Sequence, residues 1–207
     1  MFKSPLELSQ QEIIEQVMLT AYLAEYAEWD NRTHLERVRR YTYILANGMG
    51  MGHEQANLLS VAAMLHDVGK ITIPVSILKK TANLEKSEYK ITERHTTEGA
   101  RLLHRSSSPI FQAGALVAQT HHERWDGSGY PEGLKGEAIP LGGRIMAIVD
   151  VFDALTTWRP YKKEISARDA HDLLKNSSGV LFDPQLIGFF SNKFDEFVSI
   201  FKSTNQN

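Results

Sequence analysis

The sequence predicts an all-helical protein, and three observations support this prediction. Apolar residues recur at helical spacing in several segments, most clearly over residues 141–155, the most apolar helix expected in the chain. No segment shows the sustained alternation of apolar and polar residues that is typical of a strand. Cap residues and prolines precede several of the helical segments, where helix starts are expected.

Three helices are expected in the first part of the chain. Residues 6–29 have helical apolar spacing but carry no motif that indicates a function. Thr33 and Glu36 form a capping box, which predicts a second helix with Thr33 as its N-cap. A third helix is expected from the apolar run 58–65 and should end at Gly69, since glycine commonly follows the last turn of a helix.

The second part of the chain is expected to contain a loop between helices. Glycine and proline crowd residues 125–140, which is typical of a series of turns. Helices are expected on both sides of it, because cap residues precede apolar runs there. The expected starts are Ser108 with Pro109, Leu141, Ser166 with Asp169, and Asp183 with Pro184, the last opening a Phe-rich helix that runs to Phe201.

Composition restricts the class of protein. The chain has 207 residues, 42% of them hydrophobic and 23% charged, with a net charge of -2. This is typical of a globular protein and unsuited to nonspecific binding of nucleic-acid polymers. The apolar runs are far shorter than the ~20 residues that span a bilayer, and the first residues lack the apolar core of a signal peptide. We therefore expect a cytoplasmic protein, with a helical segment over 1–28, one main domain over 29–201 and a disordered tail over 202–207.

His66 and Asp67 follow the apolar run 58–65, so an imidazole and a carboxylate are expected at the end of a buried helix. Burying such groups is costly unless they have a partner, and a metal ion is one such partner. Lys70 lies four residues after His66 and could reach an anionic ligand of that metal. The simpler interpretation is a helix end at which His66 and Lys70 only complement the helix dipole.

Further histidines and carboxylates lie on or at the ends of expected helices. With no cysteine in the chain, any metal must be held by His, Asp, Glu and water. Such a set suits iron or manganese at least as well as zinc. His121 and His122 should point about 100° apart on a helix, so we expect each to serve a different one of two adjacent ions. Asp67 could bridge these ions, and two metals could activate water to attack a phosphodiester. The complete candidate set is His34, His66, Asp67, His95, His121, His122 and Asp150.

The order and spacing of longer motifs are more specific than single residues. The two main motifs are His66-Asp67-Val68-Gly69-Lys70 and His121-His122-Glu123-Arg124-Trp125-Asp126-Gly127-Ser128-Gly129-Tyr130-Pro131; further matches are Ile73-Pro74, Ile139-Pro140-Leu141, Arg144-Ile145, Asp150, Asp153-Ala154-Leu155-Thr156, Arg159-Pro160-Tyr161-Lys162 and Phe182-Asp183-Pro184. Together they resemble the HD-GYP subgroup of the HD-domain phosphohydrolases, over about residues 34–190.

The resemblance implies an all-helical HD-domain bundle with a glycine-rich loop that hydrolyses cyclic di-GMP at a site with divalent metals. The first cut would give linear pGpG, and a second cut to GMP stays open. By position, the seven candidates fall on the family's metal ligands and Lys70 near the scissile phosphate. Substrate contacts fall on Arg159 and Lys162, with Gly129, Tyr130 and Pro131 framing the site. Members with three metals have a Glu four residues before the first His; here Asp30 stands there, so we expect two metals, with a third in doubt.

Residues around this set have simpler interpretations. We read Asp153, Glu123 and Asp126 as hydrogen-bonding groups that support the site, the run Arg37, Arg39 and Arg40 as a solvated face, and His53, His104 and His171 as surface or structural residues. Two other functions stay open: a catalytically weak module that binds cyclic di-GMP or a signalling protein, and a phosphodiesterase for another cyclic or linear dinucleotide. The N-terminal helical segment could also pair with a second copy in a homodimer.

Overall fold

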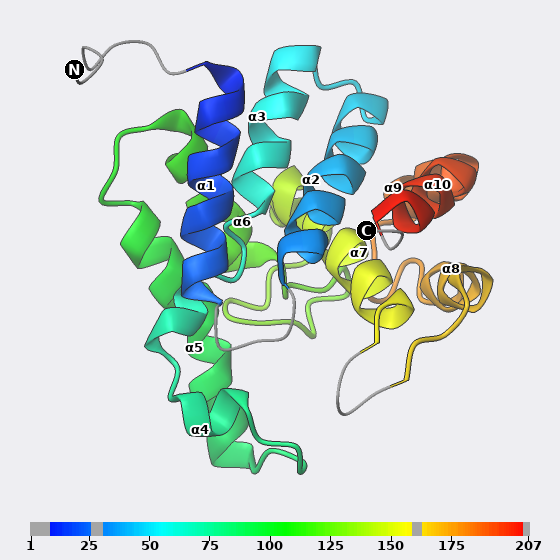
Figure 1. Ribbon diagram of the computed structural model, residues 1–207. Helices are drawn as coiled ribbons and strands as arrows, with labels where there is room; N and C mark the ends of the chain where they lie inside the picture. Colours follow the sequence, from blue (N-terminus) through cyan, green and yellow to red (C-terminus); the bar gives the residue numbers. More distant parts are fainter. Residues whose placement is uncertain (1–8, 26–30, 159–162, 205–207) are drawn as a thin grey trace.

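The computed structural model describes residues 9–25, 31–158 and 163–204, and within these ranges it contains helices and no strand. The predicted all-helical fold is therefore confirmed (Figure 1). The elements are α1 (Gln10–Ala24), α2 (Asn31–Gly48), α3 (His53–Ala63), the 3-10 helix η1 (Val68–Thr72), α4 (Val75–Leu78), α5 (Lys86–Leu103), α6 (Pro109–Thr120), the 3-10 helix η2 (Gly136–Ala138), α7 (Leu141–Thr156), α8 (Ala167–Asn176), α9 (Pro184–Asn192) and α10 (Phe194–Thr204).

Helix starts in the second half agree with the predicted caps. Ser108 precedes Pro109 at the start of α6, and the Ser166 side chain accepts a hydrogen bond from the Asp169 backbone N–H at the start of α8. Asp183 caps α9 in the same way. The first N–H groups of a helix have no intrahelical partner. At these starts a polar side chain accepts a hydrogen bond from one of them, or a proline, which has no N–H group, takes the position.

Two predicted helix boundaries are wrong. Thr33 is not an N-cap, because α2 begins at Asn31 and Thr33 lies inside it; several cap-forming residues are clustered there, so the sequence offers more than one start. The helix before His66 does not continue to Gly69 but ends at Ala63. A turn follows, and Gly69 lies within η1.

The C-terminal region also differs from the prediction. The Phe-rich segment is not one helix, since α9 ends at Asn192 and α10 begins at Phe194 after Lys193. Residues 202–204, expected to be disordered, form the last turn of α10, and 205–207 lie outside the described residues. None of the described helices combines the length and apolar character needed to cross a bilayer.

Two apolar clusters form the core. The larger joins α2, α3 and α7 to α8, α9 and α10, with Tyr41, Phe152 and Phe197 fully buried at its centre. The smaller packs α1 and α5 against α3 and α6. Helices α2, α3 and α6 contribute to both clusters, so they are held from two sides. Burial of this apolar surface is the main term that fixes the positions of these helices.

Candidate metal centre

The structure brings all seven candidate metal ligands together in two neighbouring groups. In each group, one ligand atom from every residue lies within 4.8 Å of the others. The first group is Asp67, His95, His121 and His122; the second is His34, His66 and Asp150. They come from α2, the turn after α3, α5, the end of α6 and α7, at the end of the bundle where α2 begins and α3 ends (Figure 1).

A glycine allows the turn that carries Asp67 to approach α5. A Cβ built on Gly69 would lie 1.9 Å from the His95 carbonyl oxygen and 2.6 Å from the Gly99 nitrogen. No other residue type fits that space without moving the backbone. This close packing places Asp67 Oδ1 3.3 Å from His95 Nε2. Gly69 is therefore required for packing and not for ending a helix.

Backbone hydrogen bonds orient three of the histidines. His66 Nδ1 lies 3.0 Å from the Ala63 carbonyl oxygen, and His95 Nδ1 lies 2.5 Å from that of Thr92. His121 Nδ1 is 2.9 Å from the Ala118 carbonyl oxygen. Because a carbonyl can only accept, each Nδ1 donates to it, and each Nε2 is the ring atom that faces the cluster. This is the arrangement that metal-binding histidines usually have.

Asp67 lies between the two groups. Its Oδ2 is 3.2 Å from His66 Nε2 in one group, and its Oδ1 faces His95 and His121 in the other. Lys70 Nζ lies 2.6 Å from Oδ2. Burial would raise the pKa of Asp67, but the charges of Lys70 and His66 outweigh it and hold this pKa well below its usual range. Asp67 is thus an ionised carboxylate with one oxygen toward each group.

The chemistry of these donors fits bound cations. His66 Nε2 and Asp67 Oδ1 are buried and make no hydrogen bond to any described residue. Lone pairs of neutral histidines facing a carboxylate would repel it unless a cation lies between them. A proton can take this role: burial lowers the pKa of His66, but attraction to Asp67 and Asp150 raises it to about 9. A divalent metal ion would satisfy the same atoms more completely.

Two histidines of the first group, His95 and His122, are held in the form that binds metals. Burial, which the charge of Asp67 only partly offsets, lowers the pKa of His95 to about 4. Burial and the neighbouring His121 and His95 hold the pKa of His122 well below its usual range. Both imidazoles are therefore neutral at physiological pH, as metal ligation requires.

His121 and His122 were expected to point apart, but the structure brings both into the first group. Their ring centroids lie 4.1 Å apart. The 100° rotation per residue applies only within a helix, whereas α6 ends at Thr120 and His121 is its C-cap. His122 follows in a turn, where its side chain can point to the same side as His121.

A second layer of polar residues supports His34. Asp153 Oδ2 lies 2.7 Å from His34 Nδ1, so Asp153 orients this ring. This agrees with the expectation that Asp153 is a hydrogen-bonding group that supports the site. Arg37 binds the same carboxylate and donates to Thr157 Oγ1 at 3.1 Å. Burial opposes ionisation of Asp153, but His34 and Arg37 lower its pKa to about 2. The expectation of a solvated Arg37 is wrong: its side chain is 1% exposed, because it neutralises a buried carboxylate.

The glycine-rich loop packs onto the metal-ligand turn. A Cβ on Gly129 would lie 2.4 Å from the Arg124 nitrogen, so only glycine fits there. The Tyr130 N–H donates to the His122 carbonyl at 3.2 Å, and the two rings lie 4.8 Å apart; a cis peptide bond joins Tyr130 to Pro131. The buried Glu123 carboxylate accepts hydrogen bonds from the backbone N–H groups of Glu132 and Leu134. These contacts frame one side of the cluster.

Three of the predicted site residues lie outside the described residues: Asp30, Arg159 and Lys162. Sequence reasoning also missed a buried acid, Glu25, at the end of α1. Burial and the charge of Asp67 raise the pKa of Glu25 to about 7. The sequence could have indicated the burial of Glu25, because this residue lies four positions after the buried Ala21 and shares its helix face. Likewise, Arg37 lies three residues after His34, on the face that turns toward the cluster.

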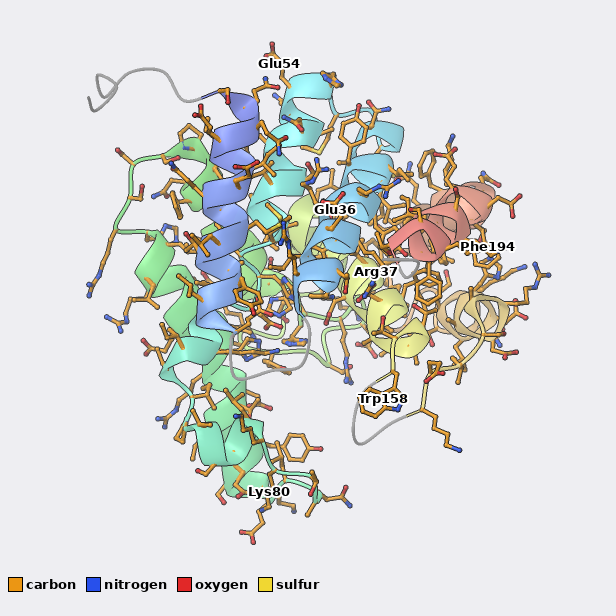
Figure 2. All side chains as sticks on the ribbon, in the orientation of Figure 1. Glu36, Arg37, Glu54, Lys80, Trp158 and Phe194 are labelled. Carbon is orange, nitrogen blue, oxygen red and sulfur yellow. The ribbon has the colours of Figure 1, made fainter. Side chains whose placement is uncertain are left out.

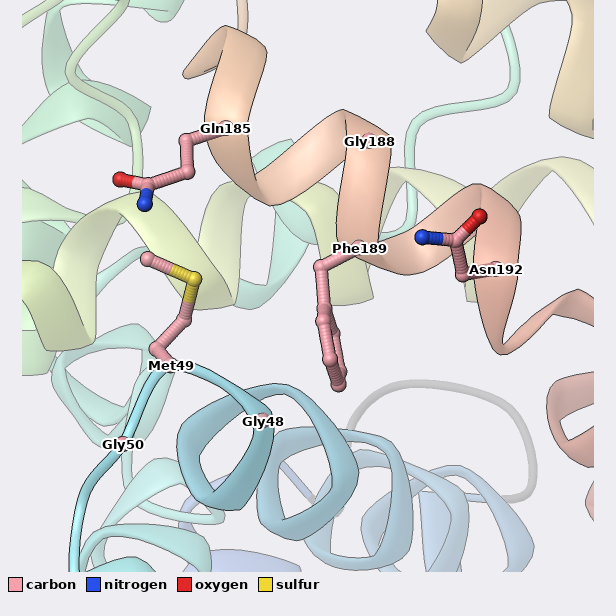
Figure 3. A pocket seen from close by; sticks show the side chains of 7 residues that line it. All are labelled: Gly48, Met49, Gly50, Gln185, Gly188, Phe189 and Asn192. Carbon is pink, nitrogen blue, oxygen red and sulfur yellow. The ribbon is translucent and has the colours of Figure 1, made fainter.

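A separate hollow of about 500 Å³ lies between the end of α2 and α9. Figure 3 shows Gln185, Asn192, Met49 and Phe189 around it. Its lining contains no titratable or metal-ligating His, Asp or Glu side chain and shares no residue with the cluster. The hollow is therefore not part of the metal centre.

Comparisons with known proteins agree with this geometry. The sequence pattern of the HD domain matches residues 17–186. A cyclic di-GMP phosphodiesterase of Thermotoga maritima is 41% identical over 190 residues, which are 92% of this chain and 52% of the relative. The 3'3'-cGAMP-specific phosphodiesterase 2 of Vibrio cholerae is 39% identical over 186 residues, 90% of this chain and 36% of the relative. The chain thus spans about half, or less, of these curated relatives.

Solved structures show the same fold. The crystal structure of a cyclic GMP-AMP-specific phosphodiesterase of Vibrio cholerae superposes with a TM-score of 0.66 at 22% identity, covering 90% of this chain and 50% of that one. An HDG"Y"P protein of Bdellovibrio bacteriovorus gives a TM-score of 0.62 at 18% identity, covering 89% of this chain and 60% of that one.

Proposed function

The chain belongs to the HD-domain family and, by its motifs, to the HD-GYP subgroup. On this basis we propose that it is a metal-dependent phosphodiesterase that hydrolyses cyclic di-GMP to linear pGpG, and the assay below determines whether GMP follows. The single observation that carries the proposal is the paired cluster, in which seven donors from five parts of the chain converge on two neighbouring positions. A protein that only binds the nucleotide has no chemical need for such a set.

His34, His66 and Asp150 would hold one divalent ion, and His95, His121 and His122 the other, with Asp67 shared between them. Iron or manganese suits these nitrogen and oxygen donors. Such ions supply Lewis-acid stabilisation of the phosphate and a water activated for attack. Asp30 is the residue at which a third ion would add a ligand, and our proposal is a site with two.

The chain's own charged residues complete the mechanism. Lys70, whose ammonium lies 2.6 Å from Asp67 Oδ2, would stabilise the negative charge that develops on the phosphate in the transition state. Arg159 would hold a second phosphate through two parallel hydrogen bonds, and Lys162 would act as a single charge, because only a guanidinium has the forked geometry. Gly129, Tyr130 and Pro131 would frame the substrate where their loop packs on His122.

A second substrate deserves the same assay. Several relatives of comparable identity are named 3'3'-cGAMP-specific phosphodiesterases, and cyclic di-GMP differs from that nucleotide in one base only. Both have the same phosphodiester ring, so the metal centre alone does not discriminate between them.

The cytoplasmic location expected from the sequence is part of the same proposal, since these messengers act there.

The experiment is an assay of protein purified without oxygen and loaded in turn with ferrous iron and manganese. Cyclic di-GMP, 3'3'-cGAMP and linear pGpG are each offered, and products are separated by chromatography. Asp67→Asn tests the centre, because it keeps the size of the side chain and removes the charge between the two groups. Asp172→Asn on α8, with its side chain 54% exposed, is the matched control.

We expect metal-dependent cleavage of cyclic di-GMP that falls at least 100-fold in Asp67→Asn, as for loss of a group essential to charge stabilisation, and that is unchanged in Asp172→Asn. Tight nucleotide binding without turnover with either metal would contradict the enzymatic proposal and favour a binding module. Faster cleavage of 3'3'-cGAMP would keep the chemistry and change the substrate.

A further inference from the structure

Glu123 is a buried acid that directly follows two candidate metal ligands, and no step of the proposed mechanism involves it. It is 2% exposed, and burying a carboxylate is costly unless hydrogen bonds compensate it. Its two oxygens accept from backbone N–H groups of the glycine-rich loop: Oε1 lies 2.8 Å from the Glu132 nitrogen, and Oε2 lies 3.0 Å from the Leu134 nitrogen. Each oxygen therefore holds a different residue of the loop.

The backbone just before these two anchors carries Tyr130. The Tyr130 N–H donates to the His122 carbonyl at 3.2 Å, Pro131 has no N–H group, and the next N–H group, that of Glu132, is the one that Glu123 accepts. The short segment from Tyr130 to Glu132 is thus attached at both ends to the stretch that follows α6. Its position depends on the carboxylate of Glu123 at one of these ends.

Tyr130 lies beside the metal centre. Its ring centroid is 4.8 Å from that of His122, and the two ring planes are inclined by 31°. Burial, and then negative charges that include those of Asp67 and Asp150, raise the pKa of Tyr130. Its hydroxyl therefore stays protonated at physiological pH and can donate a hydrogen bond. In Figure 2 the loop crosses the end of the bundle at which α2 begins, below the labelled Arg37.

We propose that Glu123 is a positioning residue whose carboxylate holds residues 130–134 so that the Tyr130 hydroxyl donates to a phosphate of the bound cyclic dinucleotide; this deepens the proposed function and rests on it. Glu123 itself would not touch the substrate. A carboxylate suits this task because it accepts from two N–H groups at once, whereas a primary amide has one acceptor oxygen and would turn its NH2 toward an N–H group. Holding Tyr130 in place before binding reduces the entropy lost when the substrate binds.

The test is a double-mutant cycle of Glu123→Gln and Tyr130→Phe, with Glu137→Gln as the matched control. Glu123→Gln keeps the size of the side chain and leaves one of the two N–H groups without an acceptor. Tyr130→Phe removes only the hydroxyl and keeps the ring that packs on His122. Glu137 is an exposed acid of the same loop, in η2. Each metal-loaded variant is assayed with cyclic di-GMP, and metal content and thermal unfolding are measured in parallel.

We expect KM for cyclic di-GMP to rise about 5- to 30-fold in each single variant, as for loss of one hydrogen bond to the substrate. We expect kcat to change less than about threefold and metal content to match the wild type. The double variant should have a KM close to the higher of the two single values, because both substitutions remove the same contact. Glu137→Gln should leave KM and kcat unchanged.

Multiplied effects in the double variant, or an unchanged KM in Glu123→Gln, would overturn the proposal and leave Glu123 with a structural role only. Loss of metal together with activity in Glu123→Gln would also overturn it, because Glu123 would then act on the metal ligands. If Glu123→Gln does not fold, Glu123→Asp, which keeps the charge on a shorter side chain, takes its place in the cycle. No turnover of any cyclic dinucleotide by the wild-type protein would overturn this inference together with the proposed function.

Discussion

At the scale of single residues, the candidate metal centre places imidazole nitrogens and a carboxylate close together in the interior. These groups repel each other unless a cation lies between them. Three histidines use Nδ1 for backbone hydrogen bonds and direct Nε2 toward Asp67. His34 is different, because its Nδ1 partner is the carboxylate of Asp153. A carboxylate partner increases the basicity of an imidazole ligand more than a carbonyl does. The group that contains His34 should therefore depend on Asp153.

Replacing Asp153 with Asn tests this dependence. The amide is of similar size, but it removes the negative charge that Asp153 presents to the buried guanidinium of Arg37 and weakens the hold on His34. We expect the free energy of unfolding to fall by about 3 kcal/mol, the usual cost of breaking a buried ion pair, and affinity for one of the two metals to fall about 10- to 100-fold. Urea unfolding and metal analysis after dialysis measure these effects, with Asp172→Asn as control. Full retention of both metals would contradict the role of Asp153.

Asp153 also predicts a dependence of stability on pH. Its pKa in the folded protein is lowered to about 2, below the unfolded value of about 3.9. A lowered pKa means that the stabilisation is complete above the unfolded value and is lost as pH falls from about 4 toward 2. It amounts to about 2–3 kcal/mol. Urea unfolding of the chelated protein between pH 5 and pH 2 should show this loss, and the curve of Asp153→Asn should be flatter. Parallel curves would show that other carboxyl groups dominate.

At the scale of elements, the centre depends on the close approach of η1 to α5. Gly69 is the residue at the point of contact, and the atoms that a Cβ would meet are backbone atoms of α5. Backbone cannot rotate away as a flexible side chain can, so a larger residue must displace one of the two elements. His95 is part of the backbone segment that would move.

Gly69→Ala should therefore reduce both stability and metal binding. We expect a loss of about 1–3 kcal/mol in the free energy of unfolding, the usual range for overpacking, together with weaker metal binding by the group that contains His95. Gly188→Ala in α9 is the matched control, because a Cβ there meets no atom within 4 Å; it should raise stability by about 0.5–1 kcal/mol. Equal effects of the two substitutions, measured by urea unfolding, would show that Gly69 is not a packing constraint.

Features that depend on neighbouring residues could be predicted from the sequence, and features that depend on distant residues could not. Caps such as Ser108, Ser166 and Asp183 were predicted because their hydrogen bonds are made within a few residues of chain. The seven candidate ligands were predicted from their residue types at expected helices, and the resemblance matched them by position, since their order is a property of the sequence. The direction of His122 was not predictable, because it depends on where α6 ends. Nor was the burial of Arg37, which is fixed by Asp153, a residue 116 positions further along the chain.

At the scale of the whole molecule, the proposed ions would connect both halves of the core. Their ligands lie on α2, α5 and α7 and at the ends of α3 and α6, and the two apolar clusters meet along α2, α3 and α6. A ligand that binds only the folded state stabilises it in proportion to the logarithm of its concentration. Removing the metals should thus lower the stability of the whole fold.

Chelation tests this expectation. With a free metal concentration 100 times the dissociation constant, binding contributes about 2.7 kcal/mol per ion, and for a chain of this size that corresponds to a rise in Tm of about 5–10 °C. Calorimetry of the protein with ferrous iron or manganese, then with a chelator, measures the difference. Asp67→Asn should show a much smaller shift. A Tm that does not respond to metal in the wild-type protein would contradict a metal centre formed by these residues.

The contact between His34 and Asp153 joins residues that are 119 positions apart. Closing so long a loop is entropically costly and comes late in folding, after local helices and their nearest neighbours have formed. Apolar core pairs such as Tyr41 and Phe152 close a loop of similar length, so we expect the ligands to converge only together with the main core, and ions would bind after it has formed. Interactions absent from the folding transition state act on the unfolding rate, so in the cell these metals would govern how long each molecule survives rather than how quickly it forms.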